Sequence, residues 1–243
     1  MAVLRAIKTV VKRAVFPKAT TRPRWDAFYA RFPPECIAER TVFVGARRMR
    51  VRALQMQSVP GTAEVVVSLL DGFPRTDTVL DYGCGTHGSR YLRTLGFPVH
   101  SCDTKDFDFP NHIRIEPDAP LPFPDERFDV TVCSEVVEHV EDPWTLLREL
   151  RRVTRKALIV TTPNVVSLKS REVFARTGYL HWFTPDVDYH VTPVFFWQLE
   201  RFCRREGIPS FERHGNQELF DIPGTEDPLL WAECLVYRLN LRA

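Results

Sequence analysis

Hydrophobic and polar positions follow two different periods along the chain. Apolar side chains recur at helical spacing near residues 3–16, 62–72, 87–95, 143–154 and 194–206. Short segments that we predict as strands, most of them rich in apolar residues, lie at about 78–81, 98–102, 128–133, 157–161, 210–214 and 231–239. Strands that alternate with helices in this way predict an α/β fold, with a mostly parallel sheet covered by helices on both faces.

The N-terminal part differs from the rest of the chain in charge. The first 52 residues hold 13 Lys and Arg against 3 Asp and Glu, a net charge of +10, whereas the remainder is acidic. The predicted helix at 3–16 is amphipathic and basic, which is compatible with an anionic-membrane contact through residues 1–20, a homo-oligomer interface or a cap on the core. We therefore predict a basic helical extension over 1–60, which could also cover a substrate, and a main domain over 61–243.

The cysteine spacing and the length of the apolar runs indicate where in the cell the protein is expected. The six cysteines contain no Cys-x-x-Cys pair, which favours reduced thiols over a disulfide framework or a zinc site. No apolar run approaches the roughly 20 residues that span a bilayer. We expect a cytoplasmic protein, peripheral to the membrane if the basic helix binds lipid.

The run Val79-Leu80-Asp81-Tyr82-Gly83-Cys84-Gly85 is the first candidate binding site. An apolar strand leads into an acid and two glycines, which allow a sharp turn and the close approach of a ligand at the strand's carboxyl end. Gly88 completes a dinucleotide fingerprint, so at this point a nicotinamide-binding fold is also compatible. Asp103 ends the next predicted strand, where a carboxylate suits the two hydroxyls of a ribose.

A second candidate site begins at Glu135. Glu135, Glu138 and His139 are spaced to share one side of a helical turn, and His190 belongs to a later loop. Two carboxylates and two imidazoles predict a divalent-cation site, for which Mg²⁺ or Mn²⁺ is expected, with His181 as an alternative ligand. In the alternative without a metal, Glu138 bonds to the backbone and His139 faces the acceptor.

The stretch LPFPDERFDVTVCSEVVEHVEDP at 121–143 joins these motifs into an ordered set over about residues 77–215. This set resembles the class I S-adenosylmethionine-dependent methyltransferases and disfavours a dehydrogenase. The resemblance implies a Rossmann-like, mostly parallel seven-stranded sheet, with S-adenosylmethionine as cofactor. The cofactor-binding residues that it implies are Asp81, Gly83, Cys84, Gly85, Asp103, Asp118, Ala119 and Ser134.

The Glu-x-x-Glu-His motif resembles a metal-dependent branch that includes small-RNA ribose and ubiquinone-pathway O-methyltransferases. The segments 162–171 and 182–193 resemble methyltransferases of bacterial glycan biosynthesis. We therefore expect methyl transfer to a hydroxyl of a saccharide or glycan, with His139 or His190 as general base. RNA ribose and quinone or phenol acceptors stay open, although the acidic balance after residue 52 disfavours nucleic acid. A module that binds the cofactor without turnover is the alternative outside the enzymes.

Overall fold

The computed structural model describes residues 23–45, 47–56, 58–86, 88–117, 119–220 and 222–242. The predicted basic helix at 3–16 and the candidate adenine ligand Asp118 lie outside these residues.

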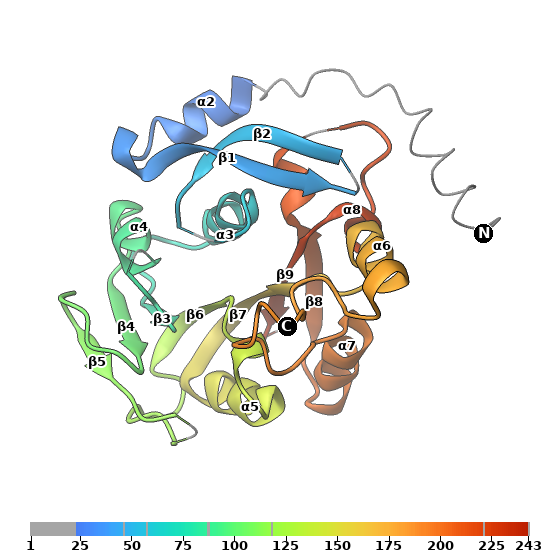
Figure 1. Cartoon of the computed structure of the whole chain (residues 1–243). Helices are drawn as coiled ribbons and strands as arrows, with labels where there is room; N and C mark the ends of the chain where they lie inside the picture. The colour runs from blue at the N-terminus through green and yellow to red at the C-terminus, as the bar shows by residue number, and fades with distance from the viewer. Residues whose placement is uncertain are drawn as a thin grey trace.

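A seven-stranded sheet forms the centre of the molecule (Figure 1). Its strands, in spatial order, are β5 (His112–Arg114), β4 (Val99–Asp103), β3 (Val79–Tyr82), β6 (Phe128–Ser134), β7 (Thr154–Pro163), β9 (Cys234–Asn240) and β8 (Ser210–Gly215). Among these described strands β9 runs antiparallel to both of its neighbours, β7 and β8, and the pairs from β5 to β7 are parallel. The predicted Rossmann-like, mostly parallel sheet is therefore confirmed.

Helices cover both faces of this sheet, as the alternating pattern predicts. On one face, α3 (Thr62–Leu70) and α4 (Gly88–Thr94) pack against Val79, Val130 and Val132. On the other face, α5 (Pro143–Val153) and α7 (Phe196–Arg205) pack against Leu80 and Cys133. Burial of these alternate strand residues in two apolar layers supplies the main driving force for this arrangement.

Residues 37–54 differ from the predicted helical extension, because they form an antiparallel hairpin. Strand β1 (Ile37–Val44) pairs with β2 (Arg47–Leu54), and Gly45 begins the tight connection at a φ of 60°. In β2, arginines alternate with Met49, Val51 and Ala53, so one face of the hairpin joins the core beside α3. The short helix α2 (Pro23–Tyr29) packs against the same cluster.

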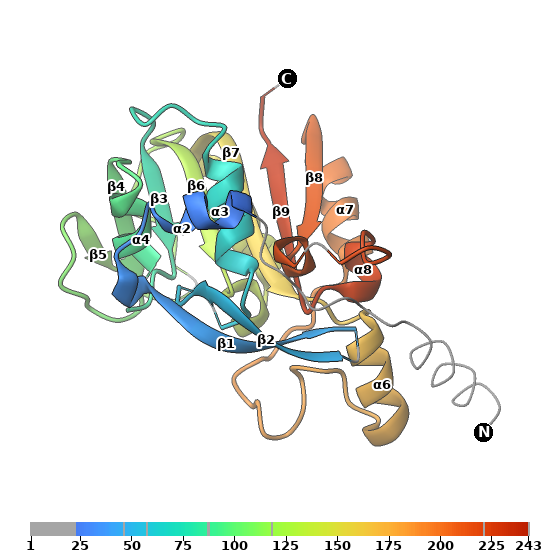
Figure 2. The same ribbon diagram turned by 90° about the horizontal axis from the view of Figure 1, so that it is seen from above.

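The hairpin lies along the end of the sheet where the parallel strands terminate (Figure 2). Helix α6 (Leu168–Thr177) projects from the same end, and the short α8 (Pro228–Trp231) lies beside it. Ser167 caps the first turn of α6 by accepting from the Ser170 amide, and Gly178 ends the helix in a left-handed conformation. Three 3₁₀ turns complete the described elements: η1 (Pro34–Cys36), η2 (Val137–His139) and η3 (Asn216–Leu219).

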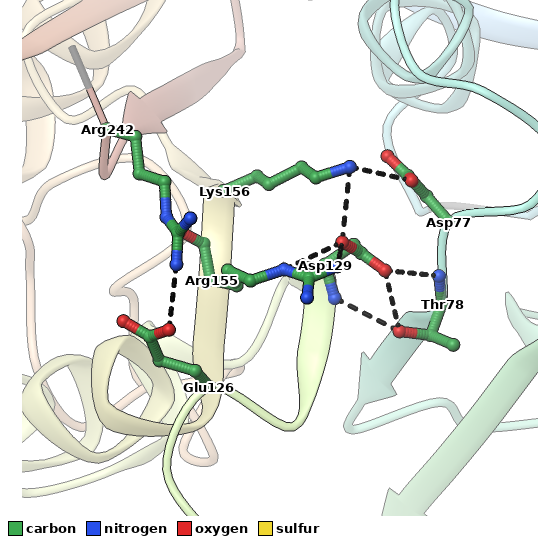
Figure 3. A network of polar contacts seen from close by, with 7 residues as sticks. All are labelled: Asp77, Thr78, Glu126, Asp129, Arg155, Lys156 and Arg242. Carbon is green, nitrogen blue, oxygen red and sulfur yellow. Dashed lines mark hydrogen bonds and ion pairs between the residues drawn. The ribbon is translucent and has the colours of Figure 1, made fainter.

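An ion-pair network secures the opposite end of the sheet, where the strands begin (Figure 3). The buried Asp129 of β6 accepts from both the amide and the hydroxyl of Thr78 at 3.0 Å. Arg155 and Lys156 of β7 also contact this carboxylate, and Lys156 reaches Asp77 at 2.7 Å. These bonds outweigh the cost of burial and hold the pKa of Asp129 far below its usual range.

Candidate active site

The loop after β3 has the geometry that its glycines predict. Gly83 and Gly85 adopt φ values of 69° and 52°, the left-handed region that favours glycine. A Cβ at Gly83 would overlap the side chain of Val136, so this glycine makes room for the neighbouring loop. A Cβ at Gly85 would meet nothing within 4 Å, and the space beside it is open to a ligand. Cys84, between them, is buried.

Asp81 lies inside this turn and fixes the start of α4. Its carboxylate accepts from the Ser89 hydroxyl at 2.9 Å, and a Cβ at Gly88 would lie 2.6 Å from Oδ2. Burial, with a smaller contribution from the nearby Asp103, raises the pKa of Asp81 to about 7 against the hydrogen bond from Ser89. Gly88 is therefore required for packing against the acid.

Asp103 ends β4 beside the glycine loop. Its Oδ2 accepts from the Gly85 amide at 3.0 Å, and its Oδ1 accepts from the Lys105 amide at 3.1 Å. The structure thus brings Asp103 and Gly85 together at the carboxyl ends of neighbouring strands. Two other predicted residues lie farther along the chain. Ser134 shares a hydrogen bond with Thr161 at 2.8 Å, and the exposed Ala119 donates its amide to the Glu116 carbonyl at 3.4 Å.

His112 is a member of this region that the sequence analysis missed. Its Nε2 lies 3.0 Å from the Lys105 carbonyl, and its Nδ1 lies 3.1 Å from the Ser101 hydroxyl. Because a carbonyl only accepts, Nε2 carries the proton and Nδ1 accepts. The rings of Phe107 and Phe109 flank the imidazole at 5.7 and 6.5 Å. His112 thereby supports the loop that presents Asp103.

The second candidate site contains Glu138, His139 and His190. One potential ligand atom of each lies within 4.8 Å of those of the other two, and the imidazole centroids are 4.7 Å apart. Glu138 is 1% exposed, and its Oε2 has no hydrogen-bond partner among the described residues. Burial raises the pKa of Glu138 to about 8.

Backbone carbonyls orient both imidazoles. His139 Nδ1 lies 3.0 Å from the Tyr189 carbonyl, and His190 Nδ1 lies 2.7 Å from the Trp182 carbonyl. Each Nδ1 must therefore donate, which leaves the lone pair of the neutral ring on Nε2. Burial lowers the pKa of His190, so this ring is neutral near pH 7. A carbonyl behind a histidine in this way is common where the other nitrogen binds a metal.

Glu135 does not join this group. Its φ of 54° places it outside the helical turn, which covers only Val137–His139, so the predicted shared face with Glu138 is wrong. Its carboxylate accepts instead from the amides of Ser58 at 2.9 Å and Val59 at 3.3 Å. His181 also lies apart, with Nε2 3.3 Å from a carboxylate oxygen of Glu233.

A cavity of about 150 Å³ opens beside the three residues. Ser58 and Val59 line it from the loop after β2, and Trp182 and Tyr189 line it from the segment before α7. A larger hollow of about 640 Å³ lies where β7 begins, and arginines line most of it. Since ligands of open α/β sheets bind at the carboxyl ends of the strands, the smaller cavity is the candidate acceptor pocket.

Comparison with known proteins finds similarity to methyltransferases. Residues 80–160 match a family described as "Methyltransferase domain". An uncharacterized methyltransferase of Mycobacterium avium is 30% identical over 141 residues, which cover 56% of this chain and 47% of the relative. The chain thus spans about half the length of the curated relatives that it matches.

Solved structures share the fold. A SAM-dependent methyltransferase from Archaeoglobus fulgidus superposes with a TM-score of 0.53 at 17% identity, over 73% of this chain and 93% of that one. A Burkholderia thailandensis N1-methyltransferase with bound S-adenosylhomocysteine has a TM-score of 0.50 at 13% identity, over 75% and 79% of the two chains. The sheet has the Rossmann-like class I methyltransferase fold, and this fold and the family match together support a SAM-dependent methyltransferase.

Proposed function

We propose that the protein is an S-adenosylmethionine-dependent O-methyltransferase that acts on a hydroxyl of a saccharide or glycan. A divalent cation, Mg²⁺ or Mn²⁺, held by Glu138, His139 and His190 would assist it. The observation that carries the proposal is the group of one buried carboxylate and two oriented imidazoles beside a small cavity.

The donor set fits a cation for two reasons. A buried carboxylate oxygen without a partner is costly, and a bound cation would remove that cost. Both Nε2 lone pairs are available, because the two Nδ1 protons are held by carbonyls. Three protein ligands would leave further coordination positions open to the acceptor.

The glycine loop fits S-adenosylmethionine. Open space at Gly85 would admit the cofactor close to the backbone, and Asp103 beside it would accept from the ribose hydroxyls. Asp81 would act indirectly, since its carboxylate is used to hold Ser89 and the start of α4.

The cavity suits a hydroxyl acceptor. In the transfer, the acceptor oxygen forms a bond to the methyl carbon as the bond from that carbon to sulfur breaks, and the hydroxyl proton must leave. A bound cation would lower the pKa of this weakly acidic hydroxyl. While both Nε2 atoms hold the cation, neither imidazole can take the hydroxyl proton, since a ligating nitrogen cannot also act as a base, and the proton would leave to water. His139 or His190 would act as the base in the alternative without a cation.

Methyl-label transfer to fractionated glycan, RNA and lipid extracts, with and without chelator, tests the proposal. We expect label in the glycan fraction, loss of transfer in chelator and recovery with Mg²⁺ or Mn²⁺. Glu138→Gln should abolish transfer without weakening cofactor binding, whereas the exposed Glu141→Gln should change neither. Transfer that is indifferent to chelator but lost in His139→Ala would contradict the cation and leave His139 as a base.

A further inference from the structure

Helix α6 is unusual in how little of it packs against the protein. Of its ten residues only Ser170 is buried, although a helix this short depends on packing for its stability. It projects beside the hairpin at the same end of the sheet as the acceptor pocket (Figure 2). Its outer face is therefore available to a partner.

Apolar side chains gather on this segment. Six large hydrophobic side chains are exposed among the described residues, and five of them fall between 174 and 197. Phe174 in α6 is 54% exposed, and Tyr179 just after the helix is 49% exposed. Tyr189 belongs to the pocket and Trp197 to α7, so Phe174 and Tyr179 are the two that lie on or next to α6. Single exposed apolar residues are ordinary, but two exposed aromatic side chains at the end of a weakly packed helix suit an interaction surface.

Basic side chains extend this surface from α6 to the hairpin. Lys169 Nζ lies 4.5 Å from the centroid of the Phe43 ring. Arg48 is paired with Phe43 across the two strands, and Arg50 with Thr41, so all four share the hairpin face opposite the core. Arg48 and Arg50 are exposed, with no ion pair to any described residue.

The acidic side chains near this surface do not cancel its positive charge. On α6, Lys169, Arg171 and Arg176 stand against Glu172, which pairs with Arg176 at 3.2 Å. On the outer face of the hairpin the exposed Glu39 lies opposite Arg52, and the exposed Asp186 and Asp188 belong to the loop after α6. Basic side chains therefore outnumber acidic ones on α6 and on this face of the hairpin. Aromatic side chains among basic ones are the combination found on surfaces that bind the headgroup region of anionic lipids.

We propose that α6, Tyr179 and the Arg48 and Arg50 side of the hairpin dock on an anionic lipid surface. Phe174 and Tyr179 enter the interfacial region while the arginines meet the headgroups. No described helix is long and apolar enough to cross a membrane, so the contact is peripheral. Docking would present a lipid-borne acceptor to the pocket, and this last step rests on the proposed function, whereas docking itself does not.

Co-sedimentation of the full chain with vesicles tests the docking. We expect binding to vesicles of phosphatidylglycerol and phosphatidylcholine, weak binding to phosphatidylcholine alone, and release by high salt. A Phe174→Ser, Tyr179→Ser variant and an Arg48→Glu, Arg171→Glu variant should each bind at least about tenfold more weakly.

The matched control lies on β5, where Ile113 is the sixth exposed apolar residue. An Ile113→Ser, Arg114→Glu variant changes the same kinds of side chain and should bind vesicles as the wild type does. Wild-type binding by the α6 variants, as expected if residues 1–22 alone bind lipid, would overturn the proposal. The proposal would also be overturned if the wild-type chain bound no vesicles and formed a dimer that the α6 variants no longer form. Unchanged cofactor affinity in calorimetry separates either failure from a failure of the proposed function.

Discussion

Glu138 offers a direct test of the candidate site through stability. Its side chain is 1% exposed, and burial, with a smaller contribution from Glu135, raises its pKa from 4.5 to about 8. In chelator, the folded protein therefore keeps a proton here that the unfolded chain releases near pH 4.5. Since the folded state binds more protons, stability falls as the pH rises from 4.5 towards 8.

The size of the effect follows from that range of pH. A tenfold change in equilibrium corresponds to about 1.36 kcal/mol, so the whole range is worth about 5 kcal/mol. Between pH 5 and 7.5, the metal-free wild type should lose about 3 kcal/mol relative to Glu138→Gln, because the amide does not ionise. Part of the stability that the metal-free wild type loses would be the free energy needed to keep the Glu138 carboxylate buried where it can bind a cation.

Urea unfolding in chelator at the two pH values measures this difference. The exposed Glu141→Gln is the control, and it should follow the wild type within about 0.5 kcal/mol at both pH values. Mn²⁺ at pH 7.5 should stabilise the wild type and Glu141→Gln, but not Glu138→Gln. The reasoning is refuted if wild type and Glu138→Gln lose stability in parallel, or if Mn²⁺ stabilises both equally.

Three further predictions concern the cofactor loop and the fold. Asp103→Ala should weaken S-adenosylmethionine binding roughly 10- to 100-fold in calorimetry, since a hydrogen bond to a charged group contributes roughly 1.5–3 kcal/mol, while Asp106→Ala should not. Gly85→Val should reduce cofactor affinity, and Gly178→Val, at a similarly open left-handed position, should cost only stability. Asp129→Asn should destabilise the protein by about 2 kcal/mol, below the usual value for a buried pair because its cationic partners are partly exposed. Because the pKa of Asp129 is depressed, urea unfolding should show this difference above pH 4 and its loss as the pH falls further.

The sequence predicted the central sheet well because its signals are local. Six of the seven strands lie at the predicted positions, and the glycine loop lies where a strand meets a helix. Strand β5 spans only three residues, too few to show a period. The alternation of arginines with apolar residues in β2 is a strand signal that the prediction missed, because the charge of this segment suggested a basic helical extension instead.

The candidate cation site was only partly predictable. Spacing correctly joined Glu138 to His139, and the acceptor loop brought His190 beside them. The same spacing failed for Glu135, because it assumes a continuous helical turn. A non-glycine residue rarely adopts a positive φ, so the sequence did not indicate that Glu135, at a φ of 54°, lies outside the helical turn.

Because of this positive φ, the Glu135 carboxylate accepts from backbone amides outside the cation site, and Glu233 makes a similar contact. Glu135 accepts from the Ser58 and Val59 amides in the loop that follows the hairpin, while the buried Glu233 accepts from the Phe43 amide at 2.8 Å and contacts His181. The hairpin pairs with no described strand of the central sheet, so these two carboxylates help its apolar contacts and the buried Glu64 of α3, which accepts from the Leu54 amide, to hold it beside the pocket. Each one links the hairpin to a segment that lines or adjoins the cavity, β6 in one case and the loop before α7 in the other. Removing the Glu233 carboxylate should therefore disturb acceptor binding before cofactor binding, whereas removing the Glu135 carboxylate should affect both, because the next residue, Val136, lies against Gly83 of the cofactor loop.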